Sequence, residues 1–248
     1  MNVWAYSLLS VVIVSLISLV GVMMVMLGSG RLDRIIPLLI SLAVGALFGD
    51  ALIHLLPEAF EDSLAPSLVS LCILLGILFF FLLERFLHWH HEHHAQSVNP
   101  VHPVAYINLV ADAFHNFLDG VIIGASYLIS IPIGLATTLA VVLHEIPQEQ
   151  GDFAILVHAG FTPRRALLMN LLSALLAVVG AVTSLLLGPA VSGYTAFMLP
   201  LIAGGFIYIA GADLIPELHH DHELPGSLAQ FAMILVGIGL MYLLLLVE

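Results

Sequence analysis

Long apolar runs follow one another along almost the whole chain. Each run has about 20 or more residues, the length that a helix needs to cross the hydrocarbon core of a bilayer. Glycine and proline mark most of the short connections between runs, as expected for turns. The pattern predicts eight membrane-spanning helices, at residues 3–27, 35–60, 66–88, 103–129, 132–159, 165–187, 195–218 and 227–247.

The composition supports this all-α, polytopic membrane class. Apolar residues make up 61% of the 248 residues and charged residues 9%, whereas soluble domains are about one quarter charged. We therefore expect a single transmembrane domain over residues 1–248 whose first span is retained and is not a signal peptide. The single cysteine, Cys72, excludes an internal disulfide. The formal charge of −12 makes nucleic acid an unexpected partner.

The arginines predict the orientation in the membrane. Arg31 and Arg34 lie between spans one and two, Arg85 closes span three, and Arg164 and Arg165 lie between spans five and six. With eight spans, these three regions share one side. The chain has no lysine, and its other loops have no arginine. The positive-inside rule places this side in the cytoplasm and both termini outside it.

Ionisable residues are concentrated in the fourth and fifth spans. They and the neighbouring amides are Asp112, His115, Asn116 and Asp119 in the fourth span, and His144, Glu145, Gln148, Glu149 and Asp152 in the fifth. A charged side chain at the bilayer centre costs about 2.5–3.5 kcal/mol. His115 and His144 each lie about 18 Å along the helix from the proline that begins their span. The two groups therefore meet near the midplane if the two helices pack together.

Imidazole, carboxylate and amide groups together are typical ligands of a divalent metal ion. They suit Zn²⁺, and to a lesser degree Fe²⁺, Mn²⁺ or Cd²⁺. A bound dication would offset most of the cost of burying Asp119, Glu145 and Glu149. Pro147 removes a backbone hydrogen bond inside the fifth span, so we expect a kink there, as at sites that line a pathway. Packing remains an alternative for a single residue such as Asp112 or His158.

Four motifs resemble the ZIP (Zrt-, Irt-like) family of divalent metal transporters. They read HNFLDG at residues 115–120, HEIPQEQGDF at 144–153, GDALIHLLPE at 49–58 and DLIPE at 213–217. The resemblance, to a bacterial-type member in the cell (inner) membrane, implies a 3+2+3 arrangement of helices and zinc uptake through a metal site between helices four and five. By motif, the implied ligands are His115, Asn116, Asp119, His144, Glu145 and Gln148, with Glu149 next to them.

Two positions depart from the family pattern. The nearest motif reads H-E-x-P-H-E, and Gln148 replaces its second histidine with a weaker, neutral ligand. Other members carry a glutamate on helix six, and ungapped counting from Pro147 places Ala177 there. We therefore expect one well-formed site and no tight binuclear one. Asn170 is a polar neighbour on the same helix.

Polar residues in other spans are candidates for the pathway. Asp50, His54 and Glu58 are spaced four apart in the second span, where they predict a stripe facing an external vestibule. Asp213 and Glu217 do the same toward the cytoplasm, and Asp152 and Asn170 complete this set. Hydrogen bonds between packed helices are the alternative role. Leu56-Pro57-Glu58 and Ile215-Pro216-Glu217 form a weak echo, which favours an inverted repeat of spans one to three with six to eight.

Histidine-rich tracts are expected on the cytoplasmic side. The loop at residues 88–102 and the loop after span seven contain His88, His90, His91, His93, His94 and His102, and His219, His220 and His222. Such tracts bind metal without a fixed geometry. We interpret them as a low-affinity trap or sensor for arriving metal, with a solvated linker as the alternative.

Two other functions compete with uptake. His144-Glu145-Ile146-Pro147-Gln148 is one residue short of the H-E-x-x-H motif of zinc hydrolases, so an intramembrane hydrolase is one alternative. A metal exporter is the other, because ligand chemistry alone does not set direction. The chain has no lysine for a phosphate-binding loop, so ATP-driven pumping is not expected. The family resemblance also suggests a homodimer.

Overall fold

A computed structural model provides the structure of the protein, described here for residues 3–22, 29–61, 64–92, 104–218 and 224–244. Within these ranges the chain forms helices and short turns, and no strand. The all-α prediction is therefore confirmed. Two elements are π-helices (η2 and η4) and two are 3₁₀-helices (η1 and η3).

The helices follow the predicted runs. In chain order they are α1 (Val3–Ile17), η1 (Ser18–Val20), α3 (Ser29–Gly49), η2 (Asp50–Leu55), α4 (Leu56–Glu61), α5 (Pro66–Glu92), α6 (Val104–Ile129), α7 (Ile131–His158), α8 (Pro163–Ala174), α9 (Leu176–Leu187), η3 (Gly188–Ala190), α10 (Tyr194–Tyr208), η4 (Ile209–Leu214), α11 (Ile215–Leu218) and α12 (Leu224–Leu244).

Six helices in the described ranges are long and apolar enough to cross a membrane, and a shorter apolar helix covers Pro66–Leu82. The chain is thus a multi-pass membrane protein. Helix α6 is 26 residues long, but its polar residues Asp112, His115, Asn116 and Asp119 lower its hydropathy, and it is not among the six. The total of eight spans stays a prediction.

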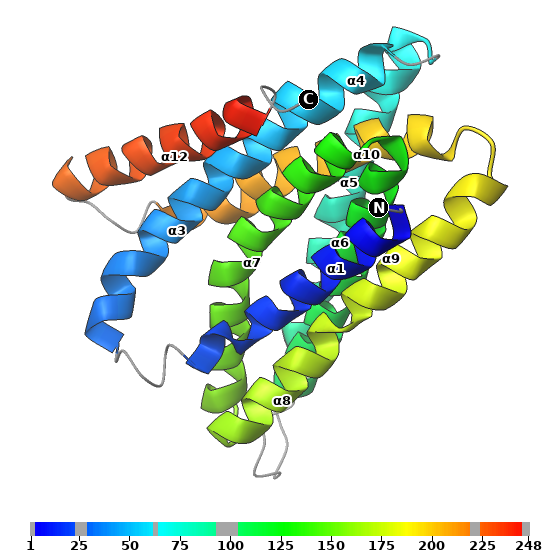
Figure 1. Ribbon diagram of the computed structural model, residues 1–248. Helices are drawn as coiled ribbons and strands as arrows, with labels where there is room; N and C mark the ends of the chain where they lie inside the picture. The colour runs from blue at the N-terminus through cyan, green and yellow to red at the C-terminus, as the bar shows by residue number, and fades with distance from the viewer. Residues whose placement is uncertain (1–2, 23–28, 62–63, 93–103, 219–223, 245–248) are drawn as a thin grey trace.

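The helices pack in close pairs, which Figure 1 shows for α3 with α12. Glycines allow the backbones to touch, as is common between membrane helices. A Cβ atom added to Gly45 of α3 would lie 2.1 Å from the carbonyl oxygen of Ile234 in α12. The same atom on Gly120 of α6 would lie 1.9 Å from the carbonyl oxygen of Ala177 in α9. These pairs therefore need glycine at the contact.

The two π-helices occupy matching places in the two halves of the chain. Helix η2 ends directly before Leu56-Pro57-Glu58, and η4 ends directly before Ile215-Pro216-Glu217. Pro57 and Pro216 lack the N–H that an α-helix needs at these positions, so the helix can relax into wider π turns. This match lends structural weight to the predicted inverted repeat.

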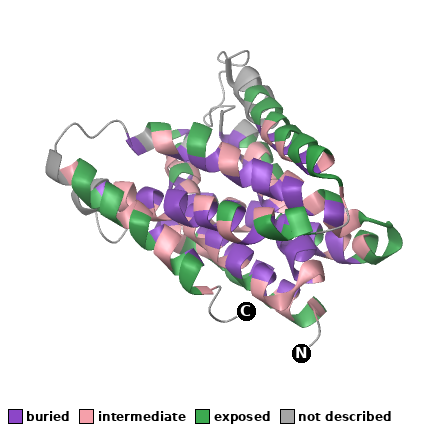
Figure 2. Cartoon of the chain, turned by 90° about the horizontal axis from the view of Figure 1, so that it is seen from above, coloured by how far each residue is buried: buried purple, intermediate pink, exposed green. Residues whose placement is uncertain are grey.

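Helix α7 lies in the interior and presents polar residues there. The Ser130 hydroxyl caps it by accepting a hydrogen bond from the Ile133 N–H at 3.2 Å. The helix then continues to His158 across Pro147. His144, Glu145 and Glu149 are all fully buried, and Figure 2 shows that buried residues gather in the central helices. The fold thus encloses the polar face that the sequence placed in the fifth span.

Candidate metal site

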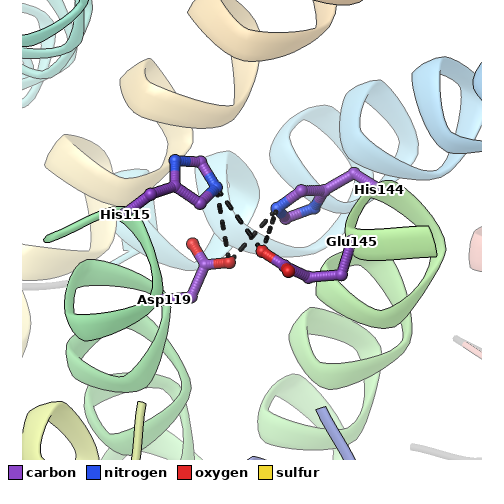
Figure 3. Close-up of side chains that lie close together, drawn as sticks. All are labelled: His115, Asp119, His144 and Glu145. Carbon is purple, nitrogen blue, oxygen red and sulfur yellow. Dashed lines mark hydrogen bonds and ion pairs between the residues drawn. The ribbon is translucent and has the colours of Figure 1, made fainter. Parts of the chain in front are cut away.

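Helices α6 and α7 bring four ionisable side chains together. His115 is the twelfth residue of the 26 in α6, and His144 is the fourteenth of the 28 in α7. Asp119 follows His115 by one helical turn, and Glu145 follows His144 directly. Figure 3 shows the four side chains pointing toward one another from the two helices. The site therefore lies near the middle of both helices.

The donor atoms of this group are close and evenly spaced. His144 Nε2 lies 3.2 Å from Asp119 Oδ2 and 3.7 Å from Glu145 Oε1. His115 Nε2 lies 3.6 Å from Asp119 Oδ2 and 3.5 Å from Glu145 Oε1. Zinc binds such atoms at about 2.0–2.2 Å in a tetrahedron, which separates neighbouring ligands by roughly 3.4 Å. Four of the six distances between these atoms thus match the edge of such a set, and one ligand atom from each residue lies within 4.8 Å of the others.

The orientation of His144 suits metal binding. Its Nδ1 lies 3.1 Å from the carbonyl oxygen of Ala140. Since a carbonyl only accepts, Nδ1 carries the proton and donates this hydrogen bond. Nε2, which makes a 3.2 Å hydrogen bond with Asp119 Oδ2, is then the nitrogen that would bind an ion. A hydrogen bond from the other ring nitrogen commonly orients metal-binding histidines.

Several polar atoms of the group are buried without a hydrogen-bond partner. They are Nε2 of His115, Oδ1 of Asp119 and both carboxylate oxygens of Glu145. The side chains of Asp119, His144 and Glu145 are fully buried, and that of His115 is 15% exposed. Buried polar atoms nearly always have a partner. A cation bound between these side chains would supply the missing partner for such atoms.

The other motif ligands lie beside this group. Asn116 donates to Asp112 Oδ1 at 2.8 Å. Glu149 accepts a hydrogen bond from the side-chain amide of Asn170 in α8. Gln148 is partly exposed, one turn after His144 on α7. That Asn116, Gln148 and Glu149 bind the same ion stays a prediction.

A second group of carboxylates contains residues that the sequence analysis did not place together. One carboxylate oxygen from each of Asp112, Glu149 and Asp152 lies within 4.8 Å of the others. Ser173 of α8 donates to Asp112, and Asn108 donates to Asp152 at 2.9 Å. Asn108 and Ser173 are not among the residues predicted from the sequence, and packing is the alternative role given there for Asp112. The spacing of four between Asn108 and Asp112 on α6 is the signal that could have found them.

The remaining pathway candidates differ in burial. His54 Nδ1 lies 3.4 Å from Asp50 Oδ1, and both side chains are fully buried. Glu58 is exposed, so the stripe leads from the surface of α4 into the interior. Asp213 lies on η4 and Glu217 on α11, but their side chains are not among those described.

The histidine-rich tracts lie mostly beyond the described residues. His88, His90 and His91 belong to the last turns of α5, where only the backbone is described. His93, His94, His102, His219, His220 and His222 lie outside the described residues, so the trap or sensor hypothesis stays a prediction.

Comparison with known proteins places the chain in a family. The model of the ZIP Zinc transporter family matches residues 1–103 and 89–245. Zinc transporter zipt-7.1 of Caenorhabditis briggsae is 32% identical over 100% of the chain and 80% of its own length. Zinc transporter ZIP13 of Pongo abelii is 34% identical over 98% of the chain and 79% of its own length. These relatives are animal proteins, so the bacterial-type assignment is not supported. The chain belongs to the ZIP family.

Proposed function

We propose that this protein carries divalent metal ions, Zn²⁺ first among them, across the membrane toward the cytoplasm. The ion would bind between α6 and α7, at His115, Asp119, His144 and Glu145. One observation carries the proposal, the 3.2–3.7 Å spacing of four buried donor atoms, two imidazole nitrogens and two carboxylate oxygens. The family relatives named above are zinc transporters, which supports the choice of ion.

The electrostatics of the group explain why an ion would enter it. Asp119 and Glu145 are both fully buried, and no basic side chain other than the two histidines contacts them among the described residues. Two like charges this close repel each other, and burial strengthens the repulsion. A dication replaces the repulsion with two attractions, whereas protons must leave the ligands before it binds.

The division of ligands between two helices explains how the ion could leave. His115 and Asp119 come from α6, and His144 and Glu145 from α7. Two of the four distances named above, His144–Asp119 and His115–Glu145, run between the two helices. The other two lie within the His115–Asp119 and His144–Glu145 pairs. A small displacement of α6 along α7 would therefore break the set while leaving each pair intact. A closed structural zinc site would normally use cysteine ligands.

The arginines support the proposed orientation in the membrane. Arg85, Arg164 and Arg165 are exposed at the ends of α5 and α8, on the side that the positive-inside rule assigns to the cytoplasm. Both termini would then face away from the cytoplasm. Acidic residues on the opposite side, such as the exposed Glu58 and Glu61 of α4, would raise the local concentration of cations there.

The test is zinc uptake by the purified protein in sealed vesicles. His115→Ala and Glu145→Gln should each reduce uptake to that of empty vesicles, because either change removes one of four ligands. His158→Ala is the matched control, since this histidine is exposed on the same helix as Glu145. Uptake by both site variants at the wild-type rate would remove α6 and α7 as the site. Zinc-dependent hydrolysis without flux would favour the hydrolase.

A further inference from the structure

Two hydroxyl groups in the α6–α7 region are buried without a hydrogen-bond partner. They belong to Ser126 of α6 and Thr137 of α7, both 0% exposed. In the described part of the chain, neither hydroxyl oxygen has a partner. A hydroxyl inside a helix can bond to the carbonyl one turn earlier, as Thr138 does to Gly134 at 2.6 Å. Ser126 and Thr137 do not, so their hydroxyls are available to a group outside their own helical turn.

The two residues lie at the same level above the four-residue site. Asp119 of α6 and His144 of α7 meet at 3.2 Å, and the two helices are joined by a turn at Ser130. Ser126 follows Asp119 by seven residues, and Thr137 precedes His144 by seven. Seven residues are two helical turns, about 10.5 Å, with a drift of only about 20° around the helix. Both residues are thus on the helix faces that form the site, two turns nearer the α6–α7 connection.

Contacts of the neighbouring residues support this alignment of α6 and α7. The hydroxyl of Tyr127, next to Ser126 on α6, accepts a hydrogen bond from Thr138, next to Thr137 on α7, at 3.5 Å. A Cβ atom added to Gly134 of α7 would lie 2.2 Å from the ring of Tyr127. The two helices therefore touch at the level of Ser126 and Thr137.

An apolar layer separates the two hydroxyls from the four-residue site. Ile123 lies midway between Asp119 and Ser126 on α6, and Ala140 lies midway between Thr137 and His144 on α7. Both apolar side chains are 0% exposed. The order along the two helices, from the connection inward, is therefore a hydroxyl pair, an apolar layer and the four ionisable side chains.

We propose that Ser126 and Thr137 line the outer part of the ion route, where their hydroxyl oxygens replace water molecules of the entering ion. The inference rests on the proposed function, since it takes the α6–α7 connection to face away from the cytoplasm. The ligand is a divalent cation that still carries part of its hydration shell. Neutral hydroxyls hold such an ion weakly, and conduction requires binding that is weak enough to be left. The ion then passes the Ile123 layer to the charged site.

A pair of thiols tests whether the two side chains face one space. In a Cys72→Ala background, Ser126→Cys with Thr137→Cys places two soft ligands there, which suit Cd²⁺. Cadmium bound to thiolate sulfur absorbs in the ultraviolet, whereas cadmium on imidazole or carboxylate does not, so the other histidines do not interfere. The purified double variant should bind one Cd²⁺ per chain roughly tenfold more tightly than either single cysteine variant, because the second thiol acts at high effective concentration.

The matched control moves one thiol to the next residue. Ser126→Cys with Thr138→Cys should bind Cd²⁺ no better than the single variants, because residue 138 points about 100° away from residue 137 on the helix. Misfolding does not tighten binding in one pair alone. Equal affinity of the Ser126–Thr137 pair and the single variants would overturn the shared space.

Zinc uptake in vesicles tests the role in the route. Ser126→Ala with Thr137→Val removes both hydroxyls at nearly constant size, and uptake at low zinc concentration should fall by roughly tenfold, as for two lost polar contacts. Zinc binding at equilibrium should stay unchanged, because the four ligands remain. Ser126→Thr with Thr137→Ser keeps both hydroxyls and should transport as the wild type does. Thr138→Val is the control, since its hydroxyl already bonds to Gly134.

The outcome is separable from that of the proposed function. If wild-type vesicles take up no zinc, the proposed function fails, and the outer route fails with it. If the wild type takes up zinc and the variant without the two hydroxyls does so at the same rate, only the outer route is overturned.

Discussion

Single atoms decide what the α6–α7 group can bind. His144 donates from Nδ1 to Ala140, so Nε2, 3.2 Å from Asp119 Oδ2, is the nitrogen that would bind the ion. The spacing of four between His115 and Asp119, and the adjacency of His144 and Glu145, made these residues predictable from the sequence. The neighbours of Glu149 were not predictable in the same way, because Asn170 reaches it from a third helix. Ungapped counting had directed attention to Ala177, whose carbonyl instead packs against Gly120.

Gln148→His tests whether residue 148 reaches the ion. It lies one turn after His144 on α7, and an imidazole there adds a ligand that zinc prefers to an amide. We expect the ratio of zinc to manganese uptake to rise by roughly tenfold, the size of change that altered ligand shells produce. Competition between the two ions in the same vesicles measures it. An unchanged ratio would mean that residue 148 does not contact the ion.

At the level of elements, close contact between glycine-bearing helices determines how the site is held. Hydropathy predicted nearly every helix, because the bilayer requires long apolar runs. It did not predict the π turns of η2 and η4, since a change from α to π hydrogen bonding leaves no mark in an apolar run. Pro57 and Pro216 were the available signals, and they were interpreted only as an echo between halves.

Gly120→Ala should destabilise the protein by about 1–3 kcal/mol, because the new methyl group forces α6 away from α9. Thermal unfolding in detergent measures this change. Gly151→Ala is the control: nothing lies within 4 Å of the added atom, and alanine is a better helix former than glycine. If Gly120→Ala unfolds at the wild-type temperature, the close pairing of α6 and α9 is wrong.

At the scale of the whole molecule, orientation in the membrane decides which side supplies the ion to the proposed site. The sequence predicts it from five arginines, and the fold alone does not test it, because a helix bundle has the same contacts either way up. Movement of an ion from the proposed α6–α7 site toward the α7–α8 loop is uptake only if that loop is cytoplasmic.

Cysteine labelling measures the orientation directly. With the buried Cys72 changed to alanine, Glu61→Cys should react with a membrane-impermeant maleimide in intact cells. Arg164→Cys should react only after the membrane is opened, because its loop is cytoplasmic. Both residues are exposed, so access to the protein surface does not limit the reaction. The reverse labelling pattern would contradict the predicted orientation.

The central claim is that His115, Asp119, His144 and Glu145 share one metal ion. The most direct measurement is a crystal structure of the zinc-loaded protein with anomalous scattering recorded at the zinc edge. We predict a peak between α6 and α7 at about 2.0–2.2 Å from both Nε2 atoms and from one oxygen of each carboxylate. A zinc-saturated protein with its anomalous peaks elsewhere, and none between these four side chains, would contradict the account.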